Sequence, residues 1–221
     1  MKYAALPSAD ILLSVFVARL LAVFFWAWVS GLLLLPLAAG AQAPAPPSVS
    51  SLLQQARTLQ QQYKESEALA TYEEVLGRAP ATYEALWQAA VLSVRIGARY
   101  TDETRKAAYF SAARLYANRA LVVKPAGAEG HYAEALSLAN QATLLTARGR
   151  LLAYREMKGH VQAAVEARPT WADAWQLLGR WHYRVDHYNL LERAFSRVFL
   201  GGVPGGASTR RAIEALSRAH E

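Results

Sequence analysis

The stretch "WQLLGRWHYRV", Trp175–Val185, places a glycine, Gly179, inside a helical pattern of apolar residues. Glycine in a helix interior lowers stability by about 1 kcal/mol relative to alanine. Its position beside the large side chains Trp181, His182 and Tyr183 therefore needs a physical reason. We expect a partner helix to cross at Gly179, where the absence of a β-carbon lets two backbones approach closely.

Three earlier segments end alike, each with a proline after a helical pattern. They are "ALATYEEVLGRAP", "RLYANRALVVKP" and "GHVQAAVEARP", which end at Pro80, Pro125 and Pro169, 45 and 44 residues apart. Proline cannot continue a helix, so each marks a helix end. Counting back twelve and eight residues from each proline gives small or apolar residues: Ala68, Ala113 and Met157, then Tyr72, Ala117 and Val161. Ala56, Ala90, Ala135 and Gly179 stand at the matching positions of the preceding helices. The chain therefore contains an internal repeat, and the repeating unit is a pair of helices.

The stretch around Gly179 resembles the tetratricopeptide repeat signature, with Trp175, Leu178 and Gly179 on signature positions and His182 where tyrosine is usual. The period is longer than the usual ~34 residues by about ten. The excess lies in "ARYTDETRKAA" and "QATLLTARGRLLA", where it lengthens the turns or the helices between paired helices. We predict an all-α fold, a tetratricopeptide-like helical repeat array (α-solenoid) of about four helix pairs.

The first 41 residues read as a targeting segment. Lys2 and Arg19 precede an uncharged apolar run at 20–39, and Ala39-Gly40-Ala41 is a small-x-small cleavage site. The alternatives are an uncleaved anchor, because about 20 apolar residues can span a bilayer, or a buried core helix. We assign 1–41 to a signal peptide or N-terminal anchor, 42–50 to a Pro-rich linker and 51–221 to the repeat domain. We therefore expect the protein to be exported, and to be periplasmic or associated with the cell envelope. If the N-terminal segment is retained, we expect it to associate the protein with a membrane.

Composition narrows the function further. The chain has no cysteine, which excludes a disulfide framework, thiol catalysis and a cysteine zinc site. Its net charge is +7, and the basic residues are spread out rather than clustered in a run. This surplus of positive charge favours binding to anionic lipid, to glycan or to an acidic partner. Nucleic acid is not expected as a partner, because the sequence contains no known nucleic-acid-binding motif.

Beyond the general repeat, the chain resembles the regulator of microtubule dynamics family. The matching residues are Leu177, Leu178, Gly179, Arg180, Trp181 and Tyr183, an approximate turn at Leu200–Pro204, and a helix start with Ser208, Thr209, Ala212 and Leu216. The segment "ETRKAAYFSAARLYANRALVVKPAGAEGHYAEAL" also resembles the family's second repeat. The resemblance covers Ser51 to Glu221.

This resemblance implies a repeat domain that binds other molecules. Animal members are anchored by an N-terminal hydrophobic segment, and their repeats are associated with microtubules, partner proteins and, in one mitochondrial tether, phospholipid held in the repeat cavity. The signal-like N-terminus argues against microtubules here. The family continues with another helix pair, so we expect the last helix to expose apolar residues such as Ile213 and Leu216.

The first helices of stacked pairs line a concave groove, and this places the candidate ligand site. The expected groove residues are Arg57, Trp87, Arg95, Tyr132, Asn140, Arg180, Tyr183 and Arg184. Aromatic rings beside arginines suit a peptide terminus, a carboxylate or a lipid headgroup. The alternative is that Trp87 and Tyr132 pack between repeats while the arginines are solvated.

No pattern indicates catalysis, a cofactor or a metal. His182 and His187 are five residues apart, which does not place them on one helical face. "GGVPGG", 201–206, lacks the Lys-Ser or Lys-Thr of a phosphate loop and reads as a turn before Thr209, which we expect to cap the last helix. The leading hypothesis is a non-catalytic module that binds a protein or peptide partner. The alternative is phospholipid binding or transfer through the same groove.

Overall fold

The computed structural model describes residues 47–199 and 201–220, and every regular element within them is helical. The signal peptide or anchor predicted at 1–41 lies outside these residues, as does most of the expected linker. The helices are α2 (Val49–Gln61), α3 (Glu65–Arg78), α4 (Tyr83–Gly97), α5 (Glu103–Val123), α6 (Ala128–Gln141), α7 (Ala147–Ala167), α8 (Ala172–Asp186), α9 (Leu190–Phe199) and α10 (Thr209–Arg218), with a 3₁₀ turn at Ala142–Leu144.

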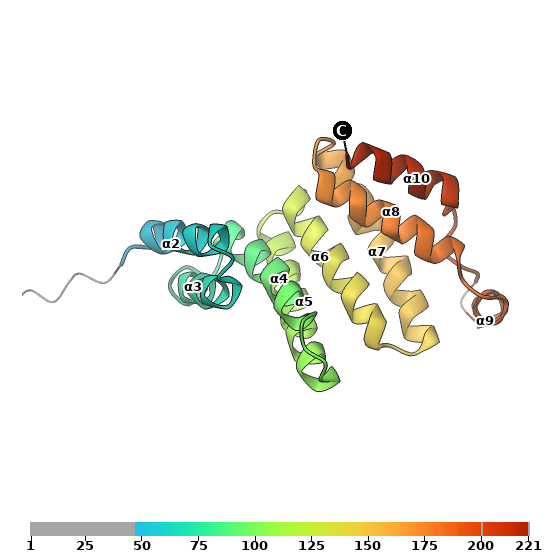
Figure 1. Ribbon diagram of the computed structural model, residues 1–221, viewed down its shortest axis with the longest axis horizontal. Coiled ribbons are helices and arrows are strands. Elements are labelled where there is room, and N and C mark those ends of the chain that lie inside the picture. The colour runs from blue at the N-terminus through green and yellow to red at the C-terminus, as the bar shows by residue number, and fades with distance from the viewer. Residues whose placement is uncertain (1–46, 200, 221) are drawn as a thin grey trace, which may run out of the picture. The chain divides into compact units, whose positions relative to one another are not determined.

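The helices pack as four successive pairs (Figure 1). The pairs are α2 with α3, α4 with α5, α6 with α7, and α8 with α10. The short helix α9 lies in the connection of the last pair and contacts α7. The predicted all-α array of four helix pairs is confirmed.

The residues that repeat at equal spacing form the contacts within and between pairs. On the first helices, Ala56, Ala90 and Ala135 are completely buried, and Gly179 is buried at the same register. The matching residues of the second helices, at the register set by the prolines, are equally inaccessible: Ala68, Tyr72, Ala113, Ala117, Met157 and Val161. Where these residues are alanine or glycine, the small side chain lets the helices approach closely, and the larger Tyr72, Met157 and Val161 fill the space between helices.

Gly179 lies where α10 crosses α8. A β-carbon there would be 2.7 Å from Cγ of Leu216 and 3.1 Å from the carbonyl oxygen of Ala212. The helix crossing predicted from the glycine is therefore present. Trp181, two residues further on, is fully buried and donates its indole N–H to the carbonyl oxygen of Tyr154 at 2.8 Å.

The prolines end helices as expected. Helices α3, α5 and α7 end at Arg78, Val123 and Ala167, two residues before Pro80, Pro125 and Pro169. The extra residues of the long repeat are taken up mainly by helix: α5 and α7 each have 21 residues, against 14 in α3. The alternative left open by the sequence, longer turns or longer helices, is resolved in favour of helices.

The connection to α10 corrects one detail of the sequence interpretation. Ser208, rather than Thr209, is the N-cap, and its hydroxyl accepts a hydrogen bond from the backbone N–H of Arg211. Thr209 instead donates its backbone N–H and its hydroxyl to the carboxylate of Asp186 at the end of α8. Of the apolar residues expected at the surface of α10, Ile213 is 62% exposed, whereas Leu216 is partly covered against Gly179.

The first described helix begins close to the proline-rich segment. Ser48 caps α2 by accepting a hydrogen bond from the backbone N–H of Ser51, so the helix starts at Val49. Within the described part of the chain, no helix combines the length and the apolar character needed to cross a bilayer.

Candidate binding groove

The first helices of neighbouring pairs contact one another, α4 with α6 and α6 with α8. They therefore form one inner face of the array, as expected for stacked helix pairs. The eight residues predicted to line a groove all belong to the helices α2, α4, α6 and α8. Their surroundings differ sharply along the array.

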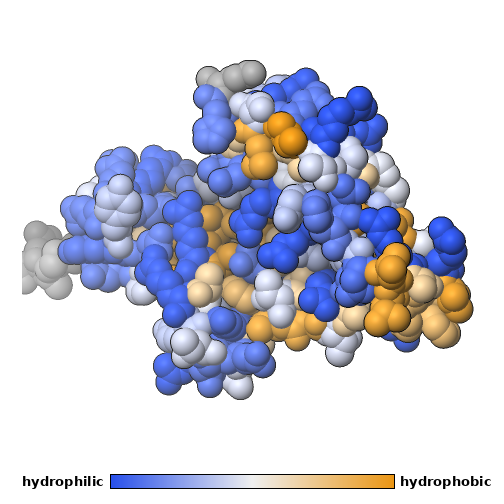
Figure 2. All heavy atoms as spheres, turned by 45° about the vertical axis from the view of Figure 1, so that its right-hand side comes forward, coloured by the Kyte–Doolittle hydropathy of each residue, from blue (hydrophilic) through white to orange (hydrophobic). Residues whose placement is uncertain are grey.

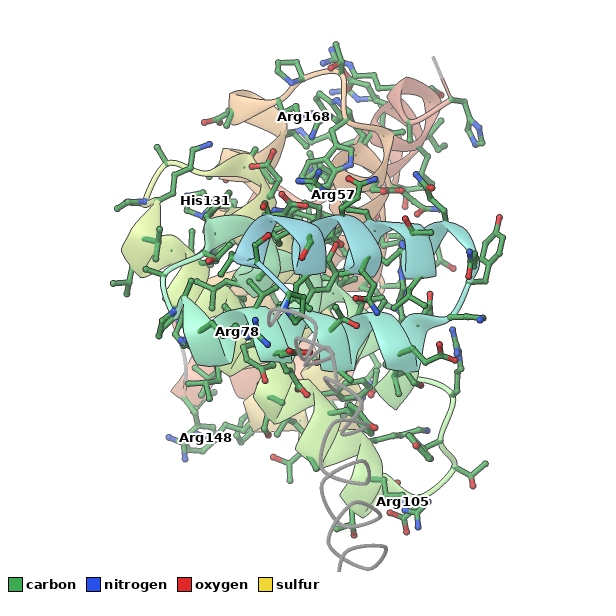
Figure 3. The ribbon with its side chains drawn as sticks, turned by 90° about the vertical axis from the view of Figure 1, so that its left-hand side faces the viewer. Arg57, Arg78, Arg105, His131, Arg148 and Arg168 are labelled. Atoms are coloured by element: carbon green, nitrogen blue, oxygen red, sulfur yellow. The ribbon has the colours of Figure 1, made fainter. Side chains whose placement is uncertain are left out.

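Two of the predicted groove arginines, Arg57 and Arg95, form ion pairs with glutamates of the domain. Arg57 projects from α2 on the side away from α3 (Figure 3) and forms a bidentate ion pair with Glu84, with nitrogen–oxygen distances of 2.6 and 2.5 Å. Arg95 lies 3.5 Å from a carboxylate oxygen of Glu65. A ligand would have to compete with these carboxylates for either arginine.

Two of the three predicted aromatic residues, Trp87 and Tyr132, mainly pack between repeats. Trp87 is half-buried and contacts the apolar clusters on both sides of α4. Tyr132 is 8% exposed, and its ring lies 4.5 Å from that of Trp171 between centroids. Burial raises the pKa of the Tyr132 hydroxyl to about 12 and nearby Asp173 adds to the rise, while Arg95 and Arg180 oppose it. Tyr132 therefore stays neutral, close to two of the groove arginines.

A first pocket, here called the α6–α8 pocket, lies between α6, α7 and α8. Its volume is about 50 Å³. The side chains of Asn140, Arg180 and Arg184 supply polar atoms to its lining, and Asn140 donates an amide N–H to the carbonyl oxygen of Leu136. The remaining lining residues are Ala139, Thr143, Tyr154, Met157, Leu177 and Trp181.

A second pocket, the α7–α9 pocket, adjoins the first and shares Tyr154 and Arg184 with it. Its volume is about 330 Å³, and its lining is entirely polar or aromatic: Arg150, Tyr154, Tyr183, Arg184, His187, Tyr188 and Glu192. Tyr183 is 51% exposed and stacks on His187, with 4.1 Å between ring centroids.

Several polar groups at these pockets have no partner in the described structure. Arg180 and Arg184 are exposed, lie one helical turn apart on α8, and make no hydrogen bond or ion pair with another described residue. Nε of Arg150 and the hydroxyl of Tyr188 are buried without a hydrogen-bond partner. Burial raises the pKa of Tyr188, with Tyr154 and Glu192 adding to the rise. The tyrosine thus remains a neutral donor.

This arrangement is suited to binding an anion. Guanidinium groups bind carboxylate and phosphate through paired N–H donors, and two arginines separated by one turn point to the same side of a helix. The carboxylate of Glu192 lies 3.6 Å from Arg150, which offsets its repulsion of an anionic ligand. In the described residues, no group of three or more His, Asp or Glu side chains is positioned to hold a metal ion.

The structure therefore brings together four of the eight predicted residues: Asn140, Arg180, Tyr183 and Arg184. The sequence reasoning missed Arg150, Tyr154 and Tyr188, because it assigned the groove to first helices alone. Arg150 and Tyr154 belong to a second helix, α7, and are four residues apart. That spacing on one helical face was the available signal.

Comparison with known proteins agrees with this architecture. Two solved structures are similar, each covering 78% of this chain at 15% sequence identity. One is described as the MamA RS-1 ArsTM double mutant, with a TM-score of 0.50 and 74% of that chain covered. The other is TTC0263, a thermophilic TPR protein in Thermus thermophilus, with a TM-score of 0.53 and 81% of that chain covered. These likenesses show the fold.

No curated protein sequence is significantly similar to this one. The family model for regulator of microtubule dynamics protein 1-3 matches residues 52–221, which include all of α3–α10 and most of α2. The match confirms the resemblance carried by the segment around Gly179. The chain belongs to the family of regulator of microtubule dynamics proteins 1-3.

Proposed function

We propose that this protein is a non-catalytic binding module that holds an acidic peptide segment of a partner protein against the arginines of α8. One observation carries the proposal. Arg180 and Arg184 stand side by side over adjoining pockets without a counterion in the described structure, whereas Arg57 and Arg95 are paired with glutamates of the domain. An incoming carboxylate would therefore displace only water from the α8 arginines.

The lining of the pockets favours a peptide over a phospholipid. The α7–α9 pocket contains no aliphatic side chain, and the apolar surface of its tyrosine rings is interrupted by charged groups, so it suits an acyl chain poorly. The apolar side chains Met157 and Leu177 line only the α6–α8 pocket, whose volume of about 50 Å³ is far below that of ordinary ligand sites. Carboxylates and backbone carbonyls match the arginine and tyrosine donors better.

The proposal includes that the module is non-catalytic, and two arguments support this part of it. Helical repeats of this kind act by presenting a continuous surface to a partner. In addition, Arg150 engages Glu192, the one carboxylate that lines either pocket, and Nδ1 of the one histidine, His187, lies 2.8 Å from the carbonyl oxygen of Tyr183. A general base needs a free group within reach of the proton that it removes.

The proposal can be tested with fluorescein-labelled peptides rich in Glu and Asp, compared with basic peptides of the same length, by fluorescence polarisation. We expect Arg180→Gln and Arg184→Gln each to weaken binding of the acidic peptide about tenfold, since a hydrogen bond to a charged group contributes roughly 1.5–3 kcal/mol. Arg148→Gln is the matched control. Arg148, labelled in Figure 3, is an exposed arginine on α7 with no ion pair in the described structure, and it is not among the residues that line the two pockets.

Two results would overturn the peptide assignment. Equal weakening by all three substitutions would mean that only the net charge attracts the peptide. Native mass spectrometry that finds one phospholipid on the purified protein, lost in Arg180→Gln but retained in Arg148→Gln, would make the groove a lipid site instead.

We further propose an exported or envelope-associated setting, which rests on the sequence of residues 1–41. The intact mass of the protein purified from separated cell fractions tests this. Loss of the first 41 residues in the exported fraction indicates a signal peptide, and a full-length chain in the membrane fraction indicates an anchor. Recovery only in the cytoplasmic fraction would refute both.

A further inference from the structure

Helix α9 exposes most of its large apolar side chains. At 100° per residue, its six apolar residues share one half of the helix circumference: Leu190, Leu191, Ala194, Phe195, Val198 and Phe199. Leu190 is 84% exposed, Leu191 82%, Val198 73% and Phe199 67%. On the opposite half, Ser196 is completely buried and the side chain of Glu192 is 18% exposed. Glu192 and Ser196 thus point toward the domain, while Arg193 and Arg197 of the same half are exposed.

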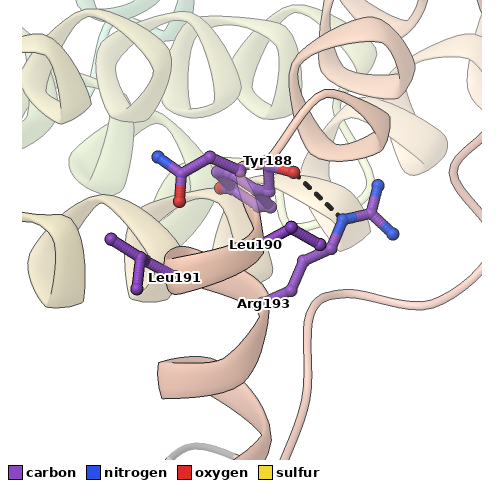
Figure 4. A pocket seen from close by; sticks show the side chains of 5 residues that line it. Tyr188, Leu190, Leu191 and Arg193 are labelled. Atoms are coloured by element: carbon purple, nitrogen blue, oxygen red, sulfur yellow. Dashed lines mark hydrogen bonds between the residues drawn. The ribbon is translucent and has the colours of Figure 1, made fainter.

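Polar contacts hold α9 in place together with one apolar residue, Phe195, which is partly buried against the core. Asn189 accepts from the backbone N–H of Glu192 at the start of the helix, and Glu192 pairs with Arg150 of α7. Arg193 donates to the backbone carbonyls of Tyr188 and Asp186, and Figure 4 shows the bond to Tyr188 beside Leu190 and Leu191. The domain therefore positions α9 without using most of its apolar face, which remains free for an external surface.

The apolar face of α9 lies at the surface of the molecule, and its first two leucines, Leu190 and Leu191, line an open hollow of about 780 Å³ beside Tyr188. Figure 1 shows α9 at the edge of the array, at the end opposite α2, and Figure 2 shows hydrophobic atoms gathered on that side of the molecule. Leucine, valine and phenylalanine are exposed at both ends of the ten-residue helix. A helix of this kind binds a bilayer by lying in the plane of the interface with its apolar half among the acyl chains.

Charge and chain composition favour a bilayer over another occupant. Arg197 is exposed beside the apolar half and has no hydrogen bond or ion pair in the described structure, so it is available to a lipid phosphate. The protein carries a net charge of +7, which complements an anionic membrane. Outside the described residues, the uncharged apolar run at 20–39 is long enough to span a bilayer, and it ends at Ala39, shortly before α2 begins at Val49.

We propose that α9 is an interfacial helix that docks this end of the repeat array on an anionic lipid bilayer. The contact involves the outward face of α9 and is separate from the α8 groove. The same protein would then hold its partner in the groove while α9 rests on a membrane.

The chain contains no cysteine, so single cysteines can report on individual positions. Full-length protein carrying Val198→Cys, labelled with the environment-sensitive fluorophore NBD, is mixed with phosphatidylcholine vesicles that contain phosphatidylglycerol. The matched control is Val122→Cys, because Val122 of α5 is also a largely exposed valine, at 81% against 73% for Val198. This control also reports any attachment made through residues 20–39 alone.

We expect NBD emission at position 198 to rise several-fold and shift to the blue with anionic vesicles, while emission at position 122 stays constant. Leu190→Asp combined with Leu191→Asp should weaken the apparent vesicle affinity about tenfold or more, because both side chains lie on the apolar half. Both leucines are over four-fifths exposed, so unchanged helical circular dichroism should accompany the loss.

Three outcomes would overturn the proposal. The first is an unchanged signal at position 198, and the second is an equal rise at positions 122 and 198. The third is a rise at position 198 that depends on protein concentration without vesicles, which would identify a second copy of the chain as the occupant. An equal response to vesicles of phosphatidylcholine alone would overturn the assignment to anionic lipid.

Discussion

Replacement of Gly179 by alanine tests how closely α8 and α10 pack. Alanine is favoured over glycine in a helix interior by about 1 kcal/mol, so the substitution would stabilise an uncrowded helix. At this position the new methyl carbon would lie 2.7 Å from Leu216 Cγ and 3.1 Å from a backbone oxygen of α10. Overpacking of this kind destabilises by about 1–3 kcal/mol. The clash outweighs the propensity gain, and we expect a net loss of about 1 kcal/mol.

Gly159→Ala provides the matched control. Gly159 lies inside α7, and no atom comes within 4 Å of a β-carbon built there, so alanine should stabilise by about 0.5–1 kcal/mol. Urea unfolding at constant m-value would then separate the two variants by roughly 2 kcal/mol, or several degrees in melting temperature for a domain of this size.

Leu216→Ala identifies the origin of the effect. In that background the main clash is gone, so Gly179→Ala should lose at least half of its penalty, a coupling expected only for residues in contact. If Gly179→Ala raises the stability as much as Gly159→Ala does, the close crossing at α10 does not constrain this position, and the reasoning from the glycine is wrong.

Three further substitutions give distinct results. Trp181→Phe removes the indole hydrogen bond to Tyr154 and leaves a void at a fully buried site, so unfolding by urea should show a loss of about 2–3 kcal/mol with the fold retained. Burial raises the pKa of Glu134 from 4.5 to about 7, although Arg114 opposes the rise, so the folded protein binds this proton more tightly than the unfolded chain. The resulting stabilisation is present below about pH 4.5 and is lost as the pH rises toward about 7, on the order of 3 kcal/mol. Glu134→Gln should therefore gain stability relative to wild type between about pH 5 and about pH 8, and a pH-independent difference would contradict the buried carboxyl. Ser208→Ala removes the N-cap of α10 and should lower the melting temperature in a thermal scan by an amount equivalent to about 1 kcal/mol, whereas no change would assign the cap to another group.

The sequence was sufficient to predict the helix pairs because their signals are local. Helices α3, α5 and α7 end two residues before Pro80, Pro125 and Pro169, since proline lacks the N–H that a helix interior requires. The small residues at equal spacing, such as Ala90 and Ala135, then mark the faces that pack. Both signals survive in any environment, which is why the fold and the pairing were predictable.

The candidate site was only half predictable, because a side chain's availability depends on what faces it. Arg57 and Arg184 look alike in the sequence, but Glu84 neutralises the first, and no described carboxylate pairs with the second. Arg150 reaches the same site from α7, a second helix, which a rule based on first helices excludes. Distances across the pairs decide these roles.

The sequence by itself determined that this chain forms stacked helix pairs, and it identified Gly179 as a crossing point, because propensity, proline and periodicity act over a few residues. Only the tertiary structure decided that α9 turns its apolar face outward. An amphipathic pattern states that one half of a helix is apolar, but not whether that half meets the core or the surface. The direction depends on contacts between residues that lie far apart along the chain, among them the ion pair of Arg150 in α7 with Glu192 in α9.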